Sequence, residues 1–254
     1  MTLLWIALAA CTTDVGEGKP KAEIVDENPP TEQAEPDAAA DAEQPAAAPS
    51  TTFEVPALSG NVQRVAVDKS SIDALGAKIT AKHPIKIHKF DGAISTEGDD
   101  VTGVAFVADV ASLEADVPKL TEHLKTEDFL DVAKWPVATF VSTDVKPGAE
   151  GGTHTVTGDL MVHGKTIRVS FPATFEVKPE EVTAKTEFVI DRQDFGVTYP
   201  GKPDDLVQDN VVLTVSFVAP RTAPTEGDAA EAPAEGEPVE GAEPEGAEGE
   251  DLED

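Results

Sequence analysis

The sequence predicts an all-β fold: an antiparallel β-barrel of about eight strands with one short helix, flanked by disordered acidic segments. Two observations lead to this fold class. Apolar and polar residues alternate with period two through the middle of the chain, which is typical of strands with one buried face. Both ends instead have a composition rich in Ala, Pro, Gly and Glu, which cannot bury enough apolar surface to fold.

The alternation is clearest after Thr166, where every second residue is apolar: Ile167, Val169, Phe171, Ala173, Phe175 and Val177. Two later segments, 184–190 and 211–217, repeat it. Weaker patterns predict strands over 62–68, 72–81, 90–96, 101–113, 137–146 and 153–163. Turn-forming residues separate these segments, so consecutive strands are expected to pair antiparallel. Alternation alone leaves a barrel and a sandwich open.

One segment breaks the strand pattern. Residues 118–125 contain good helix formers, with Leu120 and Leu124 four positions apart on one face and Pro118 suited to a first turn. We expect one short helix there.

The composition divides the chain into four parts. Residues 1–11 read as a lipoprotein signal peptide that ends at Cys11, and residues 12–51 as a disordered Ala/Pro/Glu linker. Residues 52–221 form the single folded domain, and residues 222–254 a disordered acidic tail. A flexible linker of this length would reach roughly 35 Å, which would leave the domain loosely tethered.

The charge of the chain excludes one class of partner. The formal net charge is −30, of which −8 lies in residues 12–50 and −13 in residues 222–254. Nucleic-acid binding needs a basic surface that displaces counterions, so no nucleic-acid partner is expected.

The position of the one cysteine predicts a membrane anchor. Cys11 follows ten mostly apolar residues, too few to span a bilayer, and Leu8-Ala9-Ala10-Cys11 resembles the bacterial lipobox. In that motif the thiol carries a diacylglyceryl group, which anchors the protein stably. An ordinary signal peptide is the alternative. We expect an exported, lipid-anchored protein at the periplasmic face of an outer membrane or at the cell surface.

Three stretches in order resemble the YceI-like family of exported, lipocalin-like barrels that bind polyisoprenoids. They are residues 123–143, with His123-Leu124 and Trp135-Pro136; residues 156–166, with Gly158-Asp159-Leu160; and residues 188–196, with Asp191-Arg192. The resemblance covers residues 62–219. The chain departs from the family pattern at Asp68-Lys69-Ser70-Ser71, where the family commonly has His-Ser.

The resemblance implies an apolar tunnel that holds an isoprenoid chain, such as a polyprenyl phosphate or a quinone tail, as carrier or store and without catalysis. The lining is expected to include Phe106, Phe129, Trp135, Phe140, Leu160, Phe171, Phe175, Phe188, Phe195 and Phe217. Taken singly, each phenylalanine could instead belong to a packed core. Arg192 and His123 are candidates for the ligand's headgroup, although Arg192 could equally pair with Asp191 or Asp194.

Other chemistry has little support in the sequence. The five histidines lack metal-ligand spacing, with His83 and His88 placed in a polar loop, so we expect no metal and no cofactor. No nucleophile motif is present, so an enzyme acting on a bound lipid is a weaker alternative. An adhesion or scaffold module with a filled barrel is a second alternative, and a homodimer is left open.

Overall fold

The structure, a computed structural model, describes residues 14–25 and 53–221, which are mostly strands. The predicted signal peptide with Cys11, residues 26–51 of the linker and the acidic tail lie outside the described residues. The first strands are β1 (Glu23–Ile24), β2 (Asn61–Arg64), β3 (Ser71–Lys78), β4 (Ala81–Ile87), β5 (Phe90–Glu97), β6 (Asp100–Asp109) and β7 (Leu113–Ala115). After the helix α1 (Pro118–Leu124) follow β8 (Val137–Ala149), β9 (Gly152–Val162), β10 (Lys165–Val177), β11 (Glu181–Asp191), β12 (Gly201–Lys202), β13 (Asp205–Leu206) and β14 (Asn210–Pro220). Two 3₁₀ turns, Val67–Lys69 and Val110–Ser112, complete the elements.

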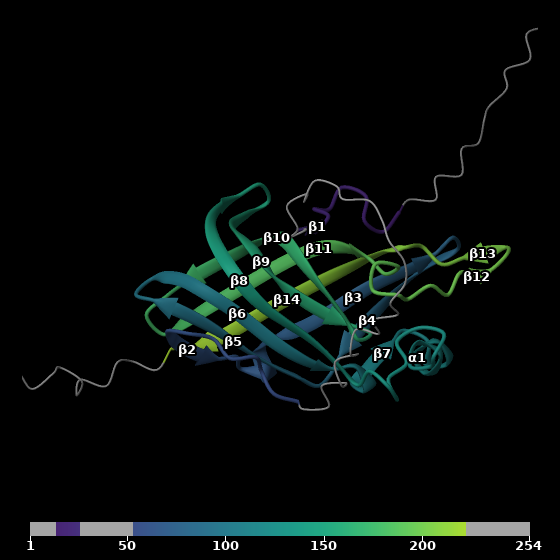
Figure 1. Cartoon of the computed structure of the whole chain (residues 1–254), viewed down its shortest axis with the longest axis horizontal. Coiled ribbons are helices and arrows are strands. Elements are labelled where there is room, and N and C mark those ends of the chain that lie inside the picture. The colour runs from purple at the N-terminus through teal and green to yellow at the C-terminus, as the bar shows by residue number, and fades with distance from the viewer. Residues whose placement is uncertain (1–13, 26–52, 222–254) are drawn as a thin grey trace, which may run out of the picture. The chain divides into compact units, whose positions relative to one another are not determined.

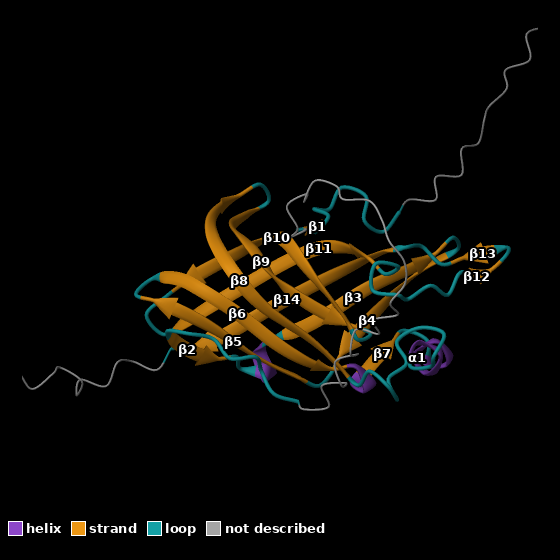
Figure 2. Ribbon diagram, viewed as in Figure 1, coloured by secondary structure: helices purple, strands orange, loops and turns teal. Residues whose placement is uncertain are grey.

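The strands form one long antiparallel sheet in the order β2-β5-β6-β8-β9-β10-β11-β14-β3-β4-β7. The sheet curls round on itself, as Figures 1 and 2 show, and the small hairpin β12–β13 projects beyond it. Backbone hydrogen bonds such as Ala66 N–H to Val218 O (2.8 Å) join β14 to the chain that follows β2. The predicted all-β antiparallel barrel is confirmed, with more strands than the eight expected.

The helix is confirmed at residues 118–124, with Pro118 in its first turn. The polar loop predicted around His83 and His88 is wrong, because residues 81–87 form β4, which pairs with β3 and β7. The pattern was hard to read because Pro84, which has no N–H to donate, lies within the strand. The short strands β7, β12 and β13 were also missed.

The two ends of the barrel differ. Aromatic side chains fill the end that we call the packed end, and a cavity lies at the end that we call the open end. At the packed end lie the turns β5–β6, β8–β9 and β10–β11. At the open end lie α1, the β3–β4 turn and the hairpin β12–β13. The alternation of β10 works as predicted, since Val169, Phe171, Ala173 and Phe175 are all buried.

One junction in the sheet is incomplete. Strands β10 and β11 pair only from Thr174 to Val177 on the β10 side, next to the packed end. Pairing stops at Pro172, which has no N–H to donate and whose carbonyl oxygen accepts a side-chain bond from Thr186 Oγ1 (2.7 Å). From there to the open end the two strands separate, and we call this separation the seam.

The N-terminal segment, residues 14–25, closes the seam by bonding to both β10 and β11. On one side, Ala22 N–H donates to Val189 O (2.8 Å) and Val189 N–H to Pro20 O (2.9 Å), which ties the segment to β11. On the other side β1 pairs antiparallel with β10, opposite Val169 and Ser170. Ala22 is buried in the main core of the barrel.

This arrangement corrects the predicted linker. Residues 14–25 are not a disordered tether, because their backbone groups complete the hydrogen bonds that β10 and β11 cannot make to each other. Val15, 3% exposed, packs on Ala77, Val189 and Val212. The loose tether expected between Cys11 and the domain is therefore replaced by a docked segment.

An aspartate at Ala22 should detach this segment, because it would bury an unpaired carboxylate in the core. We expect the Ala22→Asp variant to lose about 1–3 kcal/mol of unfolding free energy. Amide hydrogen exchange at Val189, whose N–H is bonded to Pro20 O, should become much faster. The control is Ile24→Asp in the same N-terminal segment, where the side chain is 50% exposed and little change is expected. Equal exchange in both variants would contradict the docking.

Candidate functional site

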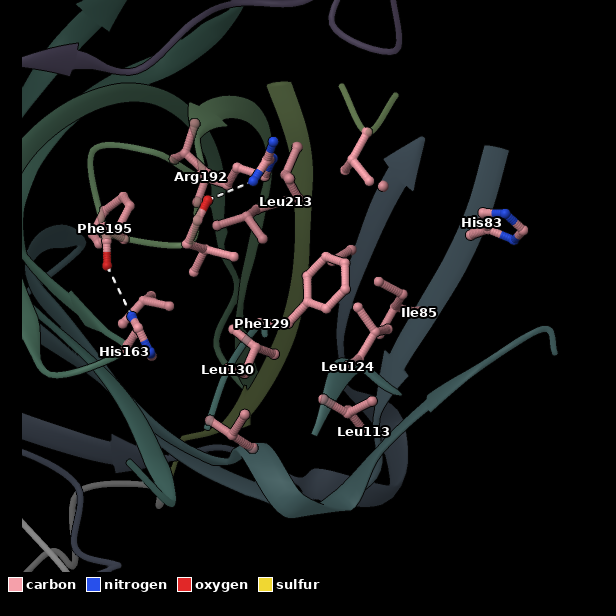
Figure 3. Close-up of a pocket in the computed structure, with 18 of the residues that line it drawn as sticks. His83, Ile85, Leu113, Leu124, Phe129, Leu130, His163, Arg192, Phe195 and Leu213 are labelled. Carbon is pink, nitrogen blue, oxygen red and sulfur yellow. Dashed lines mark hydrogen bonds between the residues drawn. The ribbon is translucent and has the colours of Figure 1, made fainter. Parts of the chain in front are cut away.

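A cavity of about 750 Å³ opens at the open end of the barrel. Its walls come from β3, β4, β11 and β14, from α1, and from the chain between β11 and β14. Figure 3 shows the apolar side chains that surround it, among them Ile85, Leu113, Leu124, Phe129, Leu130 and Leu213. The wall is mostly aliphatic and aromatic, so the cavity suits an apolar molecule.

Small residues on the inner face of the sheet create this space. Ala74 and Gly76 on β3 and Ala108 and Ala138 on the paired strands β6 and β8 line the cavity with little volume of their own. The helix α1 covers the side of the space, and its Thr121 Oγ1 accepts a hydrogen bond from Ala115 N–H (2.9 Å), which fixes it to β7. The cavity is thus the part of the barrel where inward side chains are too short to meet.

Six of the ten residues predicted to form the lining do line this cavity: Phe106, Phe129, Trp135, Leu160, Phe188 and Phe195. The other four, Phe140, Phe171, Phe175 and Phe217, do not line it. Together with Phe106 and Phe188 they pack around a hollow of about 30 Å³ deeper in the barrel. For these four the prediction of a ligand-lined tunnel is corrected to a packed core.

The physical reason for the correction is that the rings of nearby strands pack on one another, and Phe106 of β6 also reaches Phe217 of β14 across the barrel. Phe171 of β10 and Phe188 of β11 stack at 4.0 Å between ring centroids, and Phe140 lies 5.4 Å from Phe171. Phe106 contacts Phe140 and Phe217 at 5.7 and 6.1 Å. Stacked and edge-on aromatic pairs at these distances are favourable and leave no room for a chain.

Arg192 is only 6% exposed and lines the cavity, but its guanidinium is held by the protein. It donates to Val197 O (2.5 Å), Gln208 O (3.0 Å) and Asp209 Oδ1 (2.9 Å), as Figure 3 shows in part. The acidic partner is Asp209 and not Asp191 or Asp194. Arg192 therefore fixes the connection between β11 and β14, and its role toward a headgroup stays a prediction.

His123 lies at the mouth in a cluster of rings. Its ring makes edge contacts with Phe129 at 5.0 Å and Tyr199 at 5.1 Å, and Phe129 and Tyr199 are 4.9 Å apart. Its Nε2 lies within hydrogen-bond distance of Asp128 Oδ2, at 2.8 Å. This cluster joins α1 to the chain after β11 and forms one side of the mouth.

Trp135 and His163 form another side. The turn His163-Gly164 between β9 and β10 has positive φ at both residues, 52° and 72°, as a tight hairpin turn requires. A Cβ on Gly164 would lie only 2.5 Å from the ring of Trp135, so glycine allows that ring to cover the turn. Trp135 thus closes this part of the cavity wall, where the sequence analysis expected it to line the cavity.

Charged residues that the sequence did not single out lie at the mouth. Lys78, Lys119 and Lys202 line it beside Asp73 and Asp205. The Lys78 ammonium, hydrogen-bonded to Asp205, and a bond from Thr80 hold the pKa of that carboxyl below its usual value. Only the antiparallel pairing of β12 with β13 brings Asp205 here, and those two-residue strands have no sequence signal.

The part of the chain that the structure describes gives no group of three His, Cys, Asp or Glu residues placed to hold a metal ion. Among its residues that line the cavity there is no Ser, Thr or Cys. Its helices are too short or too polar for any to cross a bilayer.

Comparison with known proteins identifies a family match and several relatives of the chain. The YceI-like domain matches residues 41–219. A UPF0312 protein of Pseudomonas fluorescens is 35% identical over 134 residues, which cover 49% of this chain and 68% of the relative. A UPF0312 protein of Pseudomonas savastanoi is 39% identical over 113 residues, 42% of this chain and 56% of the relative. The second match thus spans little more than half of the relative's length.

Solved structures agree with the fold. BcnA of Burkholderia cenocepacia has a TM-score of 0.56 at 25% identity and covers 61% of this chain and 99% of its own. A polyisoprenoid-binding domain of Saccharophagus degradans has a TM-score of 0.52 at 12% identity, which shows a shared fold, and covers 65% of this chain and 100% of its own. The ordered motifs, the curled sheet and the match over residues 41–219 lead to one conclusion: the chain belongs to the YceI-like family.

Proposed function

We propose that the chain binds an isoprenoid lipid, a polyprenyl phosphate or a quinone tail, in its cavity, as a non-catalytic carrier or store. The observation that supports this most is the cavity of about 750 Å³ with a mainly apolar wall. Its volume falls within the range of small-molecule pockets, roughly 300–1,000 Å³. An isoprenoid chain gains about 25 cal/mol for each Å² of apolar surface it removes from water, and needs no polar anchor inside.

The structure bears on both alternatives. An adhesion or scaffold module would be favoured by a filled barrel, whereas here only the part around Phe140, Phe171 and Phe217 is filled. A lipid-modifying enzyme would need a reactive group beside the ligand. The histidines of the lining, His83, His123 and His163, have partners in Asp116, Asp128 and Phe195 O. With no Ser, Thr or Cys among the described lining residues, binding is the simpler function.

The neighbours support the same class of ligand. The chain belongs to the YceI-like family, and the Saccharophagus degradans domain of the same fold is described as polyisoprenoid-binding. In this chain the tail would lie against Phe106, Phe188 and Leu213, and the headgroup would remain at the mouth near Lys119, Lys202 and His123. A homodimer stays a prediction.

Binding can be followed through Trp135. The chain has two tryptophans, Trp5 and Trp135, so a Trp5→Phe chain reports only from the cavity wall. We expect polyprenyl phosphate and a long-tailed quinone to shift and saturate this fluorescence, while inorganic phosphate has no effect. Mass spectrometry of an organic extract of the purified chain should find a co-purified isoprenoid. No lipid in the extract and no saturable shift would refute the proposal.

A cavity-filling substitution gives the matched test. Ala138 of β8 lines the cavity, and Ala138→Phe should weaken isoprenoid binding by at least about tenfold, or 1.4 kcal/mol. The control is Thr139→Phe, one position along the same strand and not part of the lining, because adjacent strand residues face opposite sides. Equal affinities of the two variants would place the ligand outside this cavity.

We also propose that Cys11 carries a lipid anchor and that the protein is exported. The support is the sequence Leu8-Ala9-Ala10-Cys11 after an apolar run, together with the acyl-chain energetics of lipoproteins. Intact-mass measurement of the membrane-extracted chain should show a diacylglyceryl adduct on the new N-terminal Cys11. Cys11→Ser should lose the adduct and move to the soluble fraction. An unmodified Cys11 in the membrane fraction would contradict the anchor.

A further inference from the structure

We propose that the open end of the barrel rests on the surface of a lipid bilayer, so that the cavity opens toward the membrane. The contact surface, which we call the lip, consists of Ile79, Leu206 and Val117 at the mouth of the cavity. The inference goes beyond the proposed isoprenoid binding, and its orienting step rests on the proposed anchor at Cys11.

Exposed apolar side chains gather at the lip. Seven large apolar side chains are exposed in the part of the chain that the structure describes, and three of them are Ile79 (45%), Leu206 (46%) and Val117 (42%). Ile79 N–H donates to Leu206 O at 3.0 Å, so the β3–β4 turn and the hairpin β12–β13 present their apolar side chains together. Figure 1 shows this hairpin projecting beside the end of β3, past the barrel. Val117 precedes α1 and lines the cavity itself.

The charges at this end do not repel lipid. The chain has a formal net charge of −30, yet the mouth is lined by Lys78, Lys119 and Lys202 against Asp73 and Asp205. Lys78 is paired with Asp205. The lip can therefore approach a bilayer that contains anionic lipid, which would repel the acidic stretch 222–254.

The docked N-terminal segment would hold this end at the membrane. Its first residues contact the open end, since Val15 N–H donates to Gln208 Oε1 (3.0 Å) and Asp14 Oδ2 accepts from Asn210 Nδ2 (2.9 Å). Gln208 itself lines the cavity. Cys11 is three residues before Asp14, and three extended residues span at most about 11 Å. A lipid anchor at Cys11 therefore keeps the mouth close to the bilayer, in whichever direction residues 11–13 run.

This placement gives an apolar ligand a short route. An isoprenoid that leaves the bilayer at the lip would enter a cavity walled by aliphatic side chains without passing through bulk water. The lip orients the barrel on the bilayer, and the anchor at Cys11 supplies most of the affinity for the membrane, because a few apolar side chains hold a protein to a membrane only weakly.

The experiment uses the membrane-extracted chain with the anchor on Cys11, from which residues 1–10 with Trp5 have been removed, so that Trp135 is the tryptophan of the parent. It is reconstituted in phosphatidylcholine and phosphatidylglycerol vesicles with brominated acyl chains. A second tryptophan is introduced as Ile79→Trp or Leu206→Trp, with Val62→Trp as the control. Val62 is 42% exposed and lies on β2, near the packed end. The bromine atoms quench the fluorescence of tryptophans that lie in the bilayer. After the quenching of Trp135 in the parent chain is subtracted, the quenching should be at least about twofold larger for a tryptophan at position 79 or 206 than for one at position 62. Equal quenching at all three positions, or none at 79 and 206, would overturn the proposal.

Two further variants separate the parts of the inference. Adding Ala22→Asp to the Ile79→Trp chain detaches the segment, and should reduce the quenching at position 79 toward that at 62. Unchanged quenching would refute the orienting role of residues 14–25. The vesicles contain no isoprenoid, so the result does not depend on ligand binding. Ala138→Phe should leave the quenching as it is while it weakens isoprenoid binding, and quenching lost in that variant would overturn docking through the lip.

Discussion

The separation of β10 from β11 at Pro172 is the constraint around which the rest of the structure is arranged. A proline cannot donate to a strand ladder, so the two strands part toward the open end and leave backbone groups without partners. Residues 20–25 satisfy these groups from outside, while the stacked rings of Phe171 and Phe188 hold the two strands together from inside. The missing N–H of Pro172 thus marks where the seam begins, and the N-terminal segment docks beside it.

Period-two alternation was enough to predict the fold class, because it reports which face of a strand is buried. It placed Val169, Phe171, Ala173 and Phe175 on one buried face, and the helix at 118–124 followed from the one segment with a different period. It failed at β4, where Pro84 interrupts the pattern, and at residues 14–25. There the surrounding composition is that of a disordered linker, and only Val15, Ala22, Ile24 and Val25 mark a short apolar exception.

The candidate site could be predicted only in part, because alternation says that a side chain points inward and not what it meets there. Phe129, Phe188 and Phe195 line an open cavity, whereas Phe140, Phe171 and Phe217 pack around the small hollow deeper in the barrel, and no sequence signal separates the two groups. The difference depends on the small residues across the barrel, such as Ala108 and Ala138. Arg192 was identified, but its partner Asp209 lies seventeen positions away and only the fold brings them together.

The closure of the seam has a consequence for how the domain is defined. The family match begins at residue 41, so residues 14–25 lie before the boundary that homology would assign. A fragment cut at that boundary would expose the free edges of β10 and β11, and unpaired strand edges invite pairing with another molecule. In this chain the folded domain extends beyond the boundary that homology assigns, and a stretch that composition alone would discard covers two strand edges that could otherwise pair with another molecule.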